Sequence, residues 1–159
     1  MIKIRELIRE NCVITDLKAA DKLEAIRLMA RFTCSIGGLD RAEEVAEKVI
    51  EREGEMSTGI GFGIAIPHAR LSGTDRLYMA AARSVEGIEY DSLDGLAVNL
   101  IFMLVSSESI PTAHTEVLSA LSRILSYEEV RRGLLSAGTA KEFADILAKA
   151  EEKYVEAPP

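Results

Sequence analysis

The apolar run "AVNLIFMLVSS" at residues 97–107 restricts the possible folds of this chain more than any other feature. Only Asn99 interrupts its apolar side chains before the two closing serines. A strand with one face in water would alternate apolar and polar residues, which this run does not. The run is also too short to cross a bilayer as a helix. We therefore predict a central β-strand in a sheet that is covered on both faces.

Helical periodicity precedes and follows the strand-like segments. The predicted helices are 2–8 (a short helix or turn), 19–36, 41–53, 113–125, 127–135 and 140–154, and the predicted strands are 12–17, 77–84, 97–107 and a short one at 87–91. Gly37 and Gly38 are expected to end the first long helix. Asp40 is expected to cap the second, with Glu43 completing a capping box. This order predicts a single α/β or α+β domain with a mixed sheet.

Charge and cysteine content narrow the possible functions. The 159 residues carry a formal net charge of −7, which argues against nucleic acid as a partner and leaves room for a basic protein. Cys12 and Cys34 form no C-x-x-C pair, so no zinc knuckle or redox motif is predicted. The start "MIKIRELIRE" lacks the apolar region of a signal peptide. We expect a cytoplasmic protein that does not insert into a membrane.

The segment "STGIGFGIAIPHAR" at residues 57–70 is rich in glycine but matches no common phosphate-binding loop. A dinucleotide fingerprint would need glycine where Ile64 or Ile66 stands, and no G-K-[ST] or G-x-S-x-G motif is present. The segment reads as a loop that enters a strand. On spacing alone, the glycines are best explained as structural, since they let the backbone bend or approach a neighbour.

The chain has two histidines, and both have positions that suit a site. His68 follows Pro67, which should end the strand and leave His68 on the rim of the sheet. His114 lies three and four residues before Val117 and Leu118, so we expect it to face the core from the first turn of a helix. Either histidine alone would more often be a hydrogen-bonded structural residue. Two histidines without a third ligand make a metal site the least favoured option.

Paired imidazoles suit phosphoryl transfer. A neutral imidazole is a nucleophile near neutral pH and can accept a phosphoryl group. Such a site needs donors around the phosphoryl oxygens and a partner that holds the other ring nitrogen in one tautomer. The sequence offers Arg52 at the end of a helix, and the hydroxyl and amide of Thr58.

The same residues resemble a known family, the type-2 enzyme IIA components of the bacterial phosphoenolpyruvate-dependent phosphotransferase system. This is the fructose, mannitol and nitrogen-regulatory class. A second segment, "AHTEVLSALSRIL", is similar to the family's histidine followed by a leucine-rich helix. The resemblance extends from about residue 16 to residue 147. The positions that fill the family's signature are Glu53, Ile60, Gly61, Ile64, Ala65, Ile66, Pro67 and His68.

The resemblance implies a role for each candidate residue. His68 matches the phosphorylated histidine, which accepts the group from the phosphocarrier HPr or its nitrogen-branch relative. His114 matches the second histidine, which supports the phosphoryl group, and Arg52 matches the arginine near the site. Thr58 is a neighbour only. The family's fold is a mixed sheet of about five strands with helices on both faces, here expected over residues 1–153, followed by a disordered tail at 154–159.

Two positions depart from the family pattern. Phe62 stands where the family often has Asn, and could enlarge an apolar docking patch. Ala69 replaces the commoner Gly, so this position should not need a positive φ.

The resemblance leads to three hypotheses for the function. One hypothesis is a phosphohistidine carrier that donates to a IIB component of sugar transport. The alternative is a nitrogen-regulatory protein whose phosphorylation state controls a target, without sugar transport. A third is a degenerate interaction domain. No cofactor is implied.

Overall fold

Strand β6 (Val98–Ser107) lies at the centre of the sheet, as the apolar run predicts. In the computed structural model, which describes residues 2–157, β6 pairs antiparallel with β5 (Leu77–Ile88) on one side. On its other side it pairs in parallel with two short strands, β3 (Ile64–Ala65) and β4 (His68–Leu71). Strands β1 (Val13–Ile14) and β2 (Gly59–Gly61) complete the order β1-β5-β6-β3-β2. The predicted mixed sheet is confirmed, with six strands.

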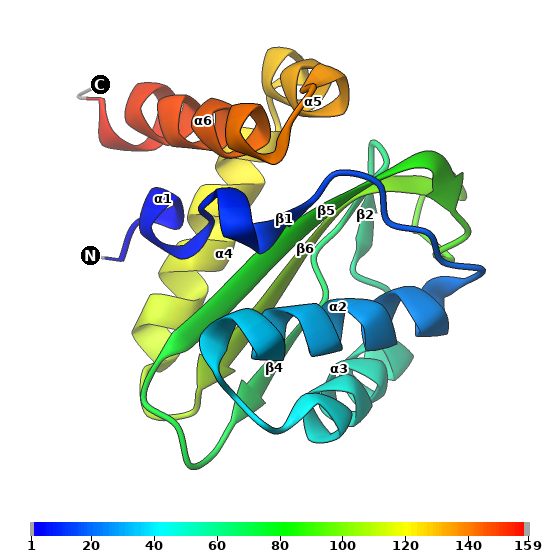
Figure 1. Cartoon of the computed structure of the whole chain (residues 1–159), viewed down its shortest axis with the longest axis vertical. Coiled ribbons are helices and arrows are strands. Elements are labelled where there is room, and N and C mark those ends of the chain that lie inside the picture. Colours follow the sequence, from blue (N-terminus) through cyan, green and yellow to red (C-terminus); the bar gives the residue numbers. More distant parts are fainter. Residues whose placement is uncertain (1, 158–159) are drawn as a thin grey trace.

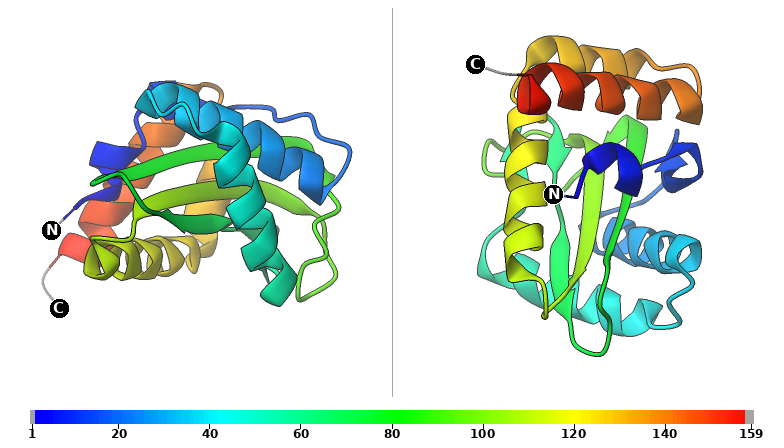
Figure 2. Two further views of the ribbon diagram at one scale, coloured as in Figure 1. Left: turned by 90° about the horizontal axis from the view of Figure 1, so that it is seen from below. Right: turned by 90° about the vertical axis from the view of Figure 1, so that its left-hand side faces the viewer.

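Helices cover both faces of this sheet, as predicted (Figures 1 and 2). Helices α2 (Lys22–Gly37) and α3 (Ala42–Glu55) pack on one face, and α1 (Ile4–Leu7), α4 (Pro111–Leu125), α5 (Glu128–Ser136) and α6 (Ala140–Glu151) pack on the other. Alternate residues of β6 point to opposite faces, so its apolar side chains divide between two cores. Leu100, Phe102 and Leu104 join the core under α4 and α6, and Ile101, Met103 and Val105 join the core under α2 and α3.

Two local expectations are wrong. Asp40 does not cap α3: the residue before the helix is Arg41, which makes no capping bond and whose guanidinium instead pairs with Glu44 at 2.7 Å. Helix α2 is the one with a capped start: Asp21 accepts from the Glu24 amide at 2.9 Å, and Glu24 accepts from the amide of Ala20, the residue before the cap, at 3.0 Å. The separate strand expected at 87–91 does not form, because β5 itself runs on to Ile88 through an irregularity after Arg83.

Two buried charged side chains bind backbone groups at helix ends. Glu151 is buried and accepts hydrogen bonds from the backbone amides of Ile4 and Arg5, at 2.6 and 3.2 Å, at the start of α1. The Arg83 guanidinium donates to backbone carbonyls of Leu134 and Ala137, at 2.8 and 2.6 Å, at the end of α5. Charged groups at these positions satisfy backbone atoms that a helix end leaves without partners.

Helical structure continues past residue 153, where the domain was expected to end. A single π-helical turn, η2 (Glu152–Glu156), continues from α6, and the Tyr154 ring stacks on Tyr127 with centroids 3.6 Å apart. The described part of the expected tail is therefore folded against the domain, while residues 158–159 lie outside the described residues.

Near the N-terminus, a short 3-10 helix, η1 (Glu10–Cys12), leads into β1. Cys12 and Cys34 are both buried free thiols. Between residues 2 and 157, no helix has the length and apolar character that a membrane span requires.

Candidate functional site

His68 is the first residue of a strand, not a residue beyond a strand end as predicted. Pro67 separates β3 from β4, but both strands lie along the same edge of β6, with Ile64 opposite Leu100 and His68 opposite Leu104. Pro67 lacks an N–H, yet its carbonyl accepts a hydrogen bond from the Leu104 amide at 3.0 Å. The proline therefore interrupts the edge strand without ending it, and the pairing resumes at His68.

The backbone fixes the tautomer of the His68 ring. Its Nδ1 lies 2.8 Å from the carbonyl oxygen of Ile66. A carbonyl oxygen can only accept, so Nδ1 carries the proton and the neutral ring keeps its lone pair on Nε2. The side chain is half-buried and lines a depression in the surface. This arrangement leaves Nε2 as the nucleophilic nitrogen.

His114 lies beside His68, although the two are far apart in sequence. It sits in the first turn of α4 and is 4% exposed, which confirms the prediction that it faces inward. The two ring centroids are 5.5 Å apart, with the planes inclined at 62°. Nδ1 of His114 is hydrogen-bonded to the hydroxyl of Ser106, a buried residue near the end of β6. The structure thus brings the two predicted histidines together.

Burial keeps His114 uncharged. It lowers the pKa of the imidazole from 6.5 to about 4, and the neighbouring Arg70 and His68 side chains contribute to a smaller extent. At neutral pH, His114 is therefore a neutral ring with a single N–H.

This pKa predicts a pH dependence of stability. Between pH 6.5 and about 4 the unfolded chain binds a proton at His114 that the folded chain does not, so the free energy of unfolding should fall as the pH is lowered. The contribution is on the order of 3 kcal/mol. Urea unfolding across this pH range should show a smaller decrease in His114→Asn than in wild type. Parallel curves for the two proteins would contradict the assignment.

Arginines border the depression that contains both histidines. The depression has a volume of about 350 Å³ and is lined by Lys48, Glu51, Arg52, Glu55, His68, Ala69, Arg70 and His114. Arg52 comes from the last turn of α3, and its guanidinium donates to the Met56 carbonyl at 3.0 Å. Arg70 was missed from the sequence. It lies two residues after His68 in β4, so the two side chains share a face of the strand. This spacing was not used in the sequence analysis, because the strand was expected to end at Pro67.

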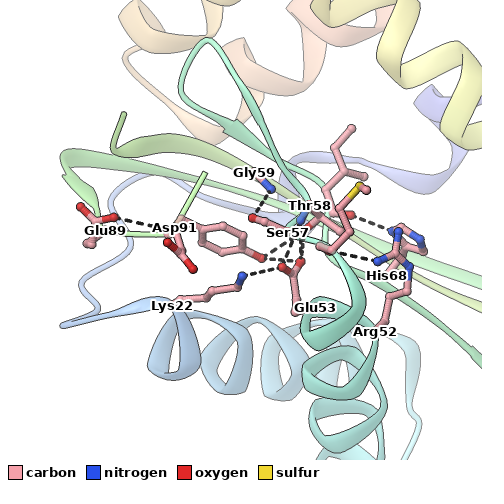
Figure 3. Close-up of polar contacts among 12 residues, drawn as sticks. Lys22, Arg52, Glu53, Ser57, Thr58, Gly59, His68, Glu89 and Asp91 are labelled. Atoms are coloured by element: carbon pink, nitrogen blue, oxygen red, sulfur yellow. Dashed lines mark hydrogen bonds and ion pairs between the residues drawn. The ribbon is translucent and has the colours of Figure 1, made fainter. Parts of the chain in front are cut away.

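Thr58 is close in sequence to the site but is engaged elsewhere (Figure 3). Its backbone amide donates to both carboxylate oxygens of Glu53, at 3.0 and 3.2 Å, and its hydroxyl also donates to Glu53. Thr58 is buried and does not line the depression. The structure therefore corrects the expectation that its hydroxyl and amide serve as donors to a phosphoryl group.

Phe62 occupies the tip of the β2–β3 hairpin with a φ of 57°, between Gly61 and Gly63, which also have positive φ. Asn tolerates this left-handed conformation better than bulky residues do, which explains why Asn suits the position. The ring is 72% exposed, and the Arg131 guanidinium lies over it at 4.5 Å. Ala69 lies inside β4 and does not have a positive φ, as expected.

For the described part of the chain, residues 2–157, no group of three or more His, Cys, Asp or Glu side chains is placed to hold a metal ion. The groups that line the depression are instead two imidazoles and two guanidiniums, together with the ammonium of Lys48 and the carboxylates of Glu51 and Glu55. Guanidiniums and a neutral imidazole N–H can all donate hydrogen bonds to an oxyanion. The arrangement can therefore hold an anionic group next to a nucleophilic nitrogen.

The mixed α/β domain thus brings two imidazoles together beside arginines, an arrangement that can accept an anionic group. Residues 6–150 match the family model described as "Phosphoenolpyruvate-dependent sugar phosphotransferase system, EIIA 2", and the chain belongs to this family. The resemblance stated from the sequence is confirmed.

Relatives of both functional branches match the chain. It is 38% identical over 133 residues to the "PTS system fructose-specific EIIA component" of Haloferax volcanii, covering 84% of this chain and 86% of the relative. It is 36% identical over 146 residues to the "PTS system fructose-specific EIIABC component" of Bacillus subtilis, covering 92% of this chain but only 23% of that longer protein. The crystal structure of nitrogen regulatory protein IIA-Ntr from Neisseria meningitidis superimposes with a TM-score of 0.85 at 31% identity, covering 91% and 98% of the two chains.

Proposed function

We propose that this protein is a phosphohistidine carrier of the phosphotransferase system. His68 accepts a phosphoryl group from HPr and passes it to a IIB component of a sugar permease. The observation that carries the proposal is the Ile66 carbonyl on Nδ1 of His68, which leaves Nε2 unprotonated beside His114 and two arginines. We expect the exchange to take place in the cytoplasm.

The transfer step follows from this geometry. The Nε2 lone pair of His68 attacks phosphorus in a phosphohistidine of the donor protein. The new N–P bond forms as the donor's N–P bond breaks, and the donor imidazole leaves with the electron pair. The ring of His68 gains positive charge, which the Ile66 carbonyl stabilises through Nδ1–H. Arg52, Arg70 and the N–H of His114 stabilise the phosphoryl oxygens.

The sugar role is supported by the identity to the fructose-specific EIIA component of Haloferax volcanii, which has a similar length. A nitrogen-regulatory role is the second candidate, and the similarity to IIA-Ntr from Neisseria meningitidis favours it. In that role the phosphoryl charge on His68 would change the binding of a target protein, with no onward transfer to a IIB component.

A reconstituted phosphorelay tests the proposal. Purified protein incubated with phosphoenolpyruvate, enzyme I and HPr should gain one acid-labile phosphoryl group, detected by mass spectrometry. Adding a fructose-class IIB component should then discharge it. No gain of phosphate with either HPr or its nitrogen-branch relative would refute the carrier function. Phosphorylation without discharge to IIB components would favour the regulatory role.

Arg52→Lys is expected to slow phosphoryl acceptance by about tenfold, since a single ammonium cannot reproduce the planar fork of a guanidinium at the phosphoryl oxygens. Quench-flow measurements with phosphorylated HPr would give the rate. Arg131→Lys is a matched control, because Arg131 lies on α5 against Phe62 and does not line the depression. Wild-type rates in Arg52→Lys would remove Arg52 from the site.

A further inference from the structure

Glu53 is a buried carboxylate that the proposed transfer step does not use. It lies at the end of α3, is 7% exposed and accepts from four groups (Figure 3). The Lys22 ammonium lies 2.7 Å from one oxygen, and the Tyr90 hydroxyl lies 3.2 Å from the other. The amide and hydroxyl of Thr58 complete the set.

Fold stability alone does not explain this cluster. Removing a carboxylate and an ammonium from water is costly, and apolar replacements of similar volume are often equally stable. Here each partner is oriented toward Glu53. Burial, followed by the charge of Glu53, raises the pKa of Tyr90, so its hydroxyl stays protonated and donates. Lys22 and Tyr90 therefore fix the carboxylate that accepts from both the amide and the hydroxyl of Thr58.

Thr58 connects this cluster to His68 through the backbone. Its carbonyl oxygen accepts from the Ile66 amide at 3.1 Å, and the Ile66 carbonyl accepts from Nδ1 of His68 at 2.8 Å. The next residue is Pro67, whose fixed φ limits rotation of the chain between the two contacts. The orientation of the Ile66 carbonyl is thus set on one side by Thr58 and on the other by the proline.

We propose that Glu53 is a positioning residue that keeps His68 in the Nδ1–H tautomer, acting through Thr58 and Ile66. This inference rests on the proposed function, in which Nε2 of His68 accepts the phosphoryl group. A ring without a fixed acceptor on Nδ1 populates both tautomers, and the Nε2–H form has no lone pair at the attacking position. Loss of the carboxylate should therefore lower the reactive fraction of His68.

Two substitutions separate the acceptor from the charge. Glu53→Leu removes the acceptor, whereas Glu53→Gln keeps an amide oxygen that can accept from Thr58. Nitrogen-15 NMR of the histidine side chains at pH 8 reports the tautomer of His68 in the unphosphorylated protein, and quench-flow gives the rate of phosphoryl acceptance. Glu53→Leu should shift the ring toward Nε2–H and slow acceptance about tenfold, since small losses of alignment have large effects on transfer. Glu53→Gln should stay within about twofold of wild type.

Arg83→Met is the control for destabilisation, because it removes another buried charged side chain. Arg83 lies opposite Leu100, four residues along β6 from Leu104, the residue opposite His68. The substitution should lower the unfolding temperature but leave the tautomer and the rate unchanged. If Glu53→Leu does not fold, Thr58→Val takes its place, because it loses the hydroxyl donor to Glu53 and should shift the tautomer in the same direction.

Three results would overturn the proposal: an unchanged tautomer in the folded variant, a shifted tautomer with a wild-type rate, or a Gln variant as impaired as the Leu variant. If wild-type protein accepts no phosphoryl group, the proposed function fails, while the NMR spectra still decide whether Glu53 sets the tautomer.

Discussion

His68→Gln is expected to abolish phosphoryl acceptance. The attacking group in the proposed step is the Nε2 lone pair, which the Ile66 carbonyl leaves free by binding Nδ1 at 2.8 Å. A glutamine side chain has a similar length, but its amide nitrogen is not nucleophilic, so no N–P bond can form. Intact-mass spectrometry after incubation with phosphoenolpyruvate, enzyme I and HPr should show no added phosphate under conditions that fully phosphorylate wild type.

The variant should remain folded, which keeps the result interpretable. His68 is half-buried at the start of an edge strand, and the backbone pairing of β4 with β6 does not depend on its ring. Unfolding temperatures within a few degrees of wild type would show this. Phosphate still gained by His68→Gln, with the label mapped to another residue, would disprove the assignment of His68 as the acceptor.

The sequence predicted the architecture well where hydrophobic patterning was strong. The run at 97–107 correctly indicated a strand covered on both faces, and the long amphipathic helices were found near their observed bounds. Helix starts were harder: Asp40 was expected to cap α3 but Arg41 precedes that helix, and Asp21, the cap of α2, was not singled out from the sequence. The strand β2 was missed, since three residues carry no periodicity, whereas the strand expected to end at Pro67 is present as the short β3.

The site was predictable only in part. His68 and His114 could be singled out because the chain has two histidines, and Arg52 because the resemblance placed it nearby. Arg70 and Ser106 could not, since each becomes relevant only through the pairing of β4 with β6, where Arg70 lies opposite Ser106. Thr58 was placed near the site from sequence distance, whereas hydrogen bonds to Glu53 turn it away.

His114→Asn is expected to slow phosphoryl transfer by about 10²-fold, because it removes one preorganised donor to the phosphoryl oxygens. The pKa of His114, lowered to about 4, makes the ring neutral, so it has one N–H to give. It can donate from Nε2 only if the Ser106 hydroxyl donates to Nδ1. Asparagine places its amide oxygen near the position of Nδ1 and can keep the Ser106 contact, but it offers nothing at Nε2. Rates in both directions should fall, measured by quench-flow with HPr and a IIB component.

His114→Gln is the matched variant, because its longer side chain can bring an amide N–H near the position of Nε2. It should recover part of the rate that His114→Asn loses, although both variants remove the same aromatic ring from the buried site. Ser106→Ala should slow transfer less than His114→Asn, since it frees the tautomer of His114 without removing the ring. If Asn and Gln variants are equally slow, the effect comes from packing against His68 and not from a donor. If both retain wild-type rates, His114 has no part in transfer, and the arginines alone must stabilise the phosphoryl group.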